Sequence, residues 1–164
     1  MRDKDGMNNN EKKKFLEKAA LQSFKSVSHG GGPFGAVIVK GGEVIAQAGN
    51  TVTRDNDPTA HAEINAIRKA AKKLNSFDLS DCEIYCSCEP CPMCLGAIYW
   101  AKMDKIYYAN TSETARKYGF DDSFIYEECS RNMEQRRIHF EHFDVDSALE
   151  AFKAWQKKQD KIEY

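Results

Sequence analysis

Residues 59–73 read TAHAEINAIRKAAKK, and this stretch decides the fold because a helical pattern and two reactive side chains coincide in it. Its apolar residues follow spacings of three, four and three, which are typical of one face of an amphipathic helix: Ile64, Ile67, Ala71 and Leu74. His61 and Glu63 therefore lie in the first turn of a predicted helix. Residues 86–94, CSCEPCPMC, supply four cysteines that could act together with them.

The flanking segments alternate between helical and strand patterns. Helices are predicted around residues 16–27, 92–102 and 147–158, and strands at 34–40, 43–49, 83–87, 105–109 and 137–143. The first two strands form a hairpin across Gly41 and Gly42. Strands that alternate with helices imply a sheet covered on both faces. We therefore expect an α/β fold, a three-layer α/β/α sandwich around a mixed sheet of about five strands.

Composition indicates a globular enzyme-sized chain with a small-molecule partner. The 164 residues are 41% hydrophobic, enough for a single core, and 24 Lys and Arg balance 25 Asp and Glu. This balance gives no global positive field for nucleic acid or membranes. Residues 1–13 are predicted to be a polar, disordered tail, and residues 14–164 a single domain. Because no signal peptide or membrane span is recognisable, we expect a cytoplasmic protein.

A metal site is indicated by Cys91 and Cys94. Prolines on both sides of Cys91 predict that it caps a helix whose first turn carries Cys94, so the two sulfurs lie on one side. The amino terminus of a helix lowers thiol pKa values and favours thiolates. His61, also at a helix start, completes a set of two sulfurs and one nitrogen suited to Zn²⁺.

The number of ligands distinguishes two readings of this site. Cys86 or Cys88 as a fourth ligand would give a closed structural zinc site without catalysis, in a zinc-stabilised binding module. The alternating pattern of residues 84–88 favours instead a buried strand, which leaves the fourth position open for water. Glu63 then becomes the acceptor for a proton of that water, whereas an arbitrary helix-surface glutamate would simply be solvated.

These motifs resemble those of the zinc-dependent nucleobase and nucleoside deaminases. The sequences HAE at 61–63 and PCPMC at 90–94 match the H-x-E and P-C-x-x-C signature of that superfamily. Four further stretches are most similar to its small guanine deaminases: GGPFGAVIV, NDPTAHAE, SCEPCPMCLGAIYWA and GFDDSFIY. The resemblance covers roughly residues 14–164 and implies the cytidine deaminase-like fold.

The activity that the resemblance implies is hydrolysis of guanine to xanthine and ammonia. In the family's scheme His61, Cys91 and Cys94 hold one zinc per chain. Water attacks the ring carbon that carries the amino group, while Glu63 protonates the adjacent ring nitrogen and then helps ammonia leave. Guanosine or cytosine remains open as an alternative substrate. Adenosine in tRNA fits less well, because the net charge is −1 and no basic docking surface stands out.

Further site residues follow mainly from the resemblance. Asn50 matches the family's purine-binding asparagine, and its amide can both donate and accept hydrogen bonds. Phe34 is expected to form an aromatic wall, the backbone of Ala62 to reach the substrate, and Asp122 to lie beside the leaving amine. Tyr164 is expected to close the active site of a partner subunit, in a homodimer that exchanges carboxyl-terminal segments.

Overall fold

The computed structural model describes residues 7–164, which form two compact units, one ending at Asp122 and the other running from Ser123 to Tyr164. The elements of the first are α1 (Asn9–Ser28), β1 (Gly35–Lys40), β2 (Glu43–Gly49), α2 (Val52–Asp55), α3 (Ala62–Leu74), β3 (Cys82–Cys88), α4 (Pro92–Trp100), β4 (Ile106–Asn110) and α5 (Ser112–Lys117). The second contains α6 (Ser123–Ser130), the 3₁₀ turn η1 (Met133–Gln135) and α7 (Asp146–Lys157).

The sheet of the first unit has the order β2-β1-β3-β4 and is mixed. Strand β1 pairs antiparallel with both β2 and β3, whereas β3 pairs parallel with β4. The predicted hairpin is confirmed: Gly41 and Gly42 have φ values of 57° and 83°, which the tight turn requires. The parallel pair needs a crossover, and α4 provides it between β3 and β4.

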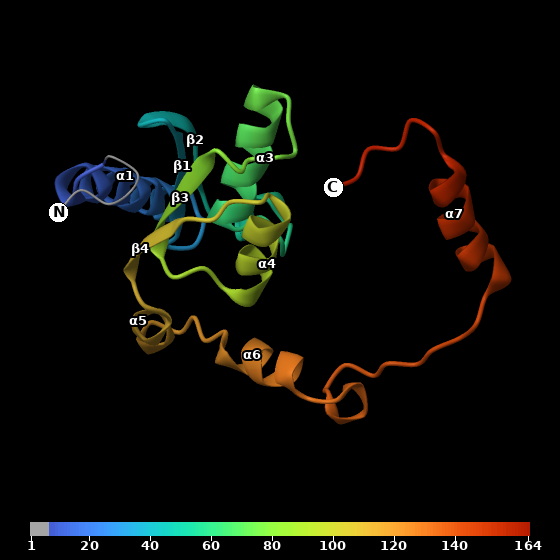
Figure 1. Cartoon of the computed structure of the whole chain (residues 1–164). Coiled ribbons are helices and arrows are strands. Elements are labelled where there is room, and N and C mark those ends of the chain that lie inside the picture. The colour runs from blue at the N-terminus through green and yellow to red at the C-terminus, as the bar shows by residue number, and fades with distance from the viewer. Residues whose placement is uncertain (1–6) are drawn as a thin grey trace. The chain divides into compact units, whose positions relative to one another are not determined.

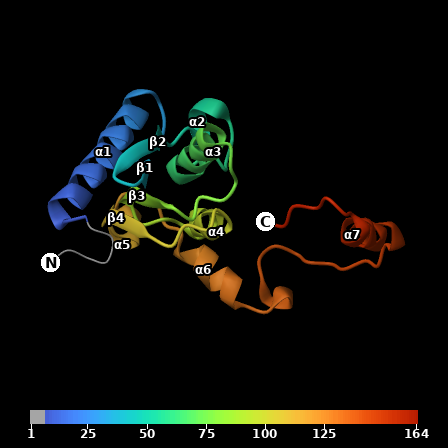
Figure 2. The ribbon, with the colours of Figure 1, turned by 45° about the horizontal axis from the view of Figure 1, so that its top comes forward.

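Helices cover the sheet on both faces, so the predicted three layers are confirmed (Figure 1). Helix α1 packs on one face, where Ala19 meets Val37, Val39 and Tyr85. Helices α3 and α4 cover the other face, and Figure 2 shows the same division from a second direction. The larger core lies on this side and includes Ala36, Ile38, Ala62, Ala66, Ile84 and Ile98.

Glycines set the close approach of α1 to the sheet. A Cβ atom at Gly35 would overlap the carbonyl oxygen of Ala19, and one at Gly49 would come within 2.8 Å of the Ser26 Cβ. The small residues Ala19 and Ser26 therefore face the sheet, and both are buried. Phe24, which shares a helical spacing with Leu16, Ala20 and Val27, is instead 74% exposed.

The predicted strand at 137–143 is wrong, and the described residues contain four strands rather than about five. Ile138 and Phe140 alternate as strand residues do, but both are exposed and belong to the second unit, whose described elements are all helical. A strand is stabilised by a neighbour, and nothing in that unit offers one. Helix α7 confirms the predicted carboxyl-terminal helix.

The amino-terminal helix begins earlier than the predicted polar tail allows. Residues 1–6 of that tail lie outside the described residues, whereas Asn9 already begins α1. The Asn8 side chain accepts hydrogen bonds from the backbone N–H groups of Asn10 and Glu11, and Glu11 accepts one in return from Asn8. This capping box explains why a polar sequence is helical here.

Candidate active site

The three predicted metal ligands come together at the starts of two helices. His61 is the N-cap of α3 and Cys91 the N-cap of α4, with Pro92 in the first turn of α4. Cys94 lies three residues further along α4, within its first turn and fully buried. Both helices thus direct their amino termini at one point, where the helix dipole favours negatively charged ligands.

The distances fit a tetrahedral zinc ion. His61 Nδ1 lies 3.6 Å from Cys91 Sγ and 3.5 Å from Cys94 Sγ, and all three donor atoms lie within 4.8 Å of one another. Zn–N bonds of about 2.0 Å and Zn–S bonds of about 2.3 Å at tetrahedral angles place nitrogen and sulfur about 3.5 Å apart. The donor set therefore fits the metal in both chemistry and spacing.

Proton affinities within this cluster agree with a thiolate site. Hydrogen bonding from Cys94, followed by His61, lowers the pKa of Cys91 to about 4. The same bond to Cys91 raises the pKa of Cys94, since it holds the shared proton, and Cys91 also raises the pKa of His61. A thiolate at Cys91 suits a divalent cation, whose binding would displace the proton of Cys94.

The remaining cysteines of the motif do not join the donor cluster. Cys86 is buried in the core, as the alternating pattern predicts. Cys88 donates from its Sγ to the carbonyl oxygen of Thr111 at 3.6 Å, and burial raises its pKa to about 11. Within residues 7–164, the group of side chains close enough together to bind one metal ion consists of His61, Cys91 and Cys94. This geometry favours the open site over the closed one.

Glu63 is buried beside the cluster. The residue is only 6% exposed, and this burial is the main reason why the pKa of its carboxyl group is raised. Within a helix, residues two apart diverge by about 200°. His61 escapes this limit because its backbone is extended, with φ −67° and ψ 156°, and both side chains line one cavity. A carboxyl group with a raised pKa can accept and return a proton near neutral pH.

A cavity of about 410 Å³ opens over His61, Glu63 and Cys91. Phe34, Asn50 and Asp122 also line it, so with Glu63 four of the predicted substrate-binding or catalytic residues lie together with the metal donors His61 and Cys91. Burial is the main cause that raises the pKa of Asp122. Ala62 is fully buried and does not line the cavity. Tyr164 ends the second unit and is 74% exposed.

Phe120 and Glu89 line the cavity but were not predicted as site residues from the sequence. Phe120 packs edge to face against Phe34, with ring centroids 4.9 Å apart at 88°. Glu89 accepts a hydrogen bond from the Ser112 backbone N–H at 2.9 Å and also lines the cavity. Both stand beside recognised motifs, Glu89 two residues before Cys91 and Phe120 two before Asp122, and this adjacency is the signal that could have revealed them.

The amide of Asn50 is oriented by the backbone around it. Its Oδ1 accepts hydrogen bonds from the N–H groups of Gly32 at 3.3 Å and Val52 at 3.1 Å. The two lone pairs of the oxygen are thereby engaged, so the Nδ2 hydrogens are the part of the amide that remains for a ligand. Asn50 is 7% exposed, which protects this arrangement from water.

Comparison with known proteins agrees with this geometry. The family model of the cytidine and deoxycytidylate deaminase zinc-binding region matches residues 9–110. Guanine deaminase of Bacillus subtilis is 52% identical over 92% of this chain and 97% of its own length. A crystal structure of guanine deaminase from that organism has a TM-score of 0.90 and 50% identity, and covers 96% of this chain and 99% of its own.

More distant relatives share the same core. A tRNA-specific adenosine deaminase of Aquifex aeolicus is 36% identical over 90% of this chain and 95% of its own length. A guanine deaminase structure from Nitrosomonas europaea matches with a TM-score of 0.63 at 32% identity, over 66% of this chain and 63% of its own. The chain belongs to the cytidine and deoxycytidylate deaminase family, and its zinc-binding signature is intact.

Proposed function

We propose that the protein is a guanine deaminase, which hydrolyses guanine to xanthine and ammonia. The observation that carries the proposal is the buried Glu63 beside the donor cluster of His61, Cys91 and Cys94, at a cavity lined by Glu63, His61 and Cys91. The 52% identity to a guanine deaminase over nearly the whole chain supports the choice of substrate. We assign the three donors to one zinc ion per chain.

The reaction adds water to the ring carbon that carries the amino group. Zinc in this site supplies a Lewis acid that makes a coordinated water more acidic. Glu63 accepts a proton from the water and delivers it to the adjacent ring nitrogen, and it then transfers the second proton to the amino group. The carbon–nitrogen bond breaks, ammonia leaves, and the carbon retains the oxygen as a carbonyl. A single carboxyl group can serve both transfers because it is regenerated between them.

The cavity walls fit a purine that presents hydrogen-bond acceptors. Guanine carries two, O6 and N7, on one edge, whereas adenine carries a donor amino group in place of O6. The Nδ2 hydrogens of Asn50 therefore suit guanine. The edge-to-face pair of Phe34 and Phe120 offers an apolar wall for the ring. We place Asp122 beside the leaving amine, where its raised pKa lets it share in proton transfer.

A substrate panel tests this assignment. We expect guanine to release ammonia at a higher kcat/KM than cytosine, cytidine or adenine, because Asn50 pairs with its acceptor edge. Guanosine presents the same edge, and we expect it to be the poorer substrate because the chain is 52% identical to a guanine deaminase. Coupled ammonia detection on purified, zinc-loaded protein measures all five. A preference for guanosine would move the assignment to nucleosides. Ammonia release from a tRNA assayed in parallel, with none from the five small molecules, would favour the tRNA-editing alternative.

We further propose a homodimer in which each carboxyl-terminal segment completes the neighbouring deaminase domain. The support is the second unit itself, because none of the residues in α6 or α7 is buried. Leu149 and Phe152 repeat along one side of α7 and are exposed, as is Phe143 before it. Apolar surface of this extent calls for a cover, and exchange between identical subunits supplies one at low cost. In this arrangement Tyr164 closes the partner's cavity.

Complementation between two inactive variants tests the exchange. One variant carries Glu63→Ala with an intact tail, and the other lacks residues 160–164. Each alone should be nearly inactive. Co-expressed at equal levels they should form about half heterodimers, each with one complete site, and so recover about one quarter of wild-type activity. The ammonia assay on the mixture gives the answer, and isolated heterodimers should show about half of wild-type activity because one of their two sites is complete.

Inactive heterodimers would contradict the exchange, because a tail that acts within its own chain cannot rescue its neighbour. Full activity of the truncated variant alone would show that Tyr164 is not needed. Co-expression of Glu63→Ala with an equally inactive Cys91→Ser protein is the matched control. Neither of those chains has a complete catalytic core, so no site can be restored in that mixture.

We also propose a cytoplasmic location. All six cysteines, which lie within the described residues, are free, as is usual in a reducing compartment. None of the helices in residues 7–164 is long and apolar enough to cross a membrane. Fractionation of the native cells tests the proposal, and recovery of the protein outside the cytoplasmic fraction would contradict it.

A further inference from the structure

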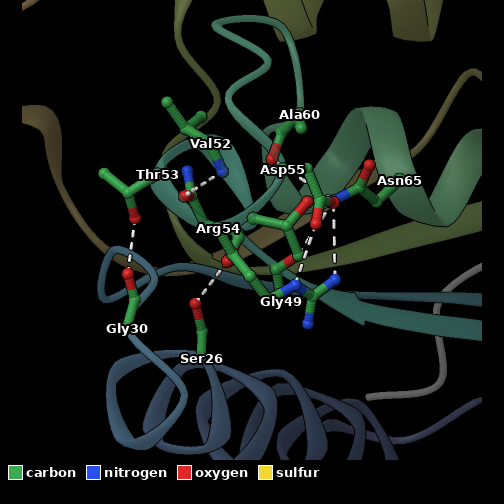
Figure 3. A network of polar contacts seen from close by, with 11 residues as sticks. Ser26, Gly30, Gly49, Val52, Thr53, Arg54, Asp55, Ala60 and Asn65 are labelled. Carbon is green, nitrogen blue, oxygen red and sulfur yellow. Dashed lines mark hydrogen bonds and ion pairs between the residues drawn. The ribbon is translucent and has the colours of Figure 1, made fainter.

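Asn65 lies one helical turn after the metal donor His61, and it does not line the active-site cavity. Its backbone N–H donates to the His61 carbonyl oxygen at 2.9 Å, in the first turn of α3. Its side-chain Nδ2 lies 3.1 Å from Gly49 O, 3.0 Å from Thr51 Oγ1 and 3.2 Å from Ala60 O. Figure 3 shows Asn65 in one polar network with Gly49 and Ala60.

The three acceptors flank the two residues that the reaction must hold in register. Gly49 and Thr51 stand on either side of Asn50, and Ala60 directly precedes His61. The backbone N–H of Thr51 donates to the Ala60 carbonyl at 2.9 Å, so the same oxygen joins both segments. One partly buried amide thus connects the end of β2, the turn after it and the residue before α3.

Asn50 depends on such support because its own position is set from several sides. Its carbonyl oxygen accepts a 2.6 Å hydrogen bond from Ser26 Oγ of α1, and its N–H donates to Phe34 O at 3.0 Å. These bonds fix the strand end to α1 and β1. The contacts of Asn65 join the same strand end to α3, which carries the metal donor. An error of about 1 Å in such a register can lower turnover about 10²-fold.

We infer that Asn65 is a positioning residue. It holds the substrate-binding side-chain amide of Asn50 in register with His61 and touches neither substrate nor metal. The inference rests on the proposed function. Asn65→Ala removes all three side-chain contacts. It should lower kcat/KM for guanine about 10- to 100-fold, mainly through kcat because misplaced substrate reacts more slowly, and leave the zinc content at one per chain.

A double-mutant cycle separates positioning from general weakening of the fold. If Asn65 acts through Asn50, then Asn65→Ala should cost much less kcat/KM in an Asn50→Ala background than in the wild type. Equal losses in both backgrounds would overturn the inference. Loss of zinc from Asn65→Ala would also overturn it, because the role would then be metal retention. An inactive wild type would instead refute the proposed function, so the two failures are distinguishable.

Two further variants complete the test. If Asn65→Ala does not fold, Asn65→Asp takes its place. Aspartate preserves the volume but offers no hydrogens to the three oxygens, so this variant should show at least the same loss of kcat/KM. Lys69→Ala is the matched control: Lys69 lies one turn further along α3 and donates to Gln47 O of β2 at 3.2 Å, away from Asn50. It should retain wild-type kcat/KM. A comparable loss in Lys69→Ala would show that any tie between α3 and β2 matters equally, against a specific role for Asn65.

Discussion

Glu63→Gln should fold and keep its zinc while kcat falls by at least 10²- to 10⁴-fold, the range attributed to general acid–base catalysis. Glutamine preserves the shape of a side chain that is buried beside the metal donors, and it removes only the proton that Glu63 transfers. Ammonia release under saturating guanine, together with metal analysis of the same sample, measures both halves of this expectation.

Glu89→Gln provides the control for a carboxylate lining the same cavity. Its amide oxygen can still accept the hydrogen bond from Ser112, so we expect kcat within about threefold of wild type. Near-normal turnover by Glu63→Gln would refute the proton-transfer role. Equal losses in both variants would point to the charge of the cavity rather than to a proton carried by Glu63.

Cys91→Ser and Cys94→Ser should each lose zinc and with it nearly all activity. A structural or catalytic zinc ion needs its thiolates, and a serine hydroxyl does not ionise near neutral pH. Purified protein, dialysed against a weak chelator, should fall from about one zinc per chain to near zero by metal analysis.

Cys88→Ser is the matched control because Cys88 belongs to the same motif, lines the same cavity and is not part of the donor cluster. It should retain zinc. Release of zinc from Cys88→Ser would revive the closed four-ligand site and remove the open position for water. Retention in all three variants would place the metal elsewhere.

Local patterns predicted the site better than the packing around it. The metal donors and Glu63 come together at the starts of α3 and α4. Pro92, which follows Cys91, marks the start of α4 in the sequence, and the extended backbone of His61 precedes α3. Such signals depend on neighbours in sequence. Adjacency to Asp122 indicates that Phe120 lies near the site, but its contact with Phe34, far away along the chain, could not be predicted from sequence neighbours.

Helix α1 shows where periodicity stops being informative. Its apolar residues recur at helical spacing, which predicts a helix that ends near His29. The structure confirms the helix and its end, with His29 as the C-cap. Of the residues that share this spacing, Leu16 packs against the sheet, whereas Phe24 and Val27 are 74% and 54% exposed. The sheet instead receives Ala19 and Ser26, since Gly35 and Gly49 bring the backbones too close for larger side chains. Only the three-dimensional partner reveals that preference.

The lining of the active-site cavity has an electrostatic consequence. Besides Glu63, it includes Glu89, Asp121 and Asp122, and the described residues around it contribute neither lysine nor arginine. A phosphate group that entered would meet carboxylates at short range, with no lysine or arginine of the lining to balance its charge. The chamber therefore discriminates by charge before it discriminates by shape. We expect free bases to enter without an electrostatic penalty, whereas the carboxylates repel the negatively charged phosphate of a nucleotide.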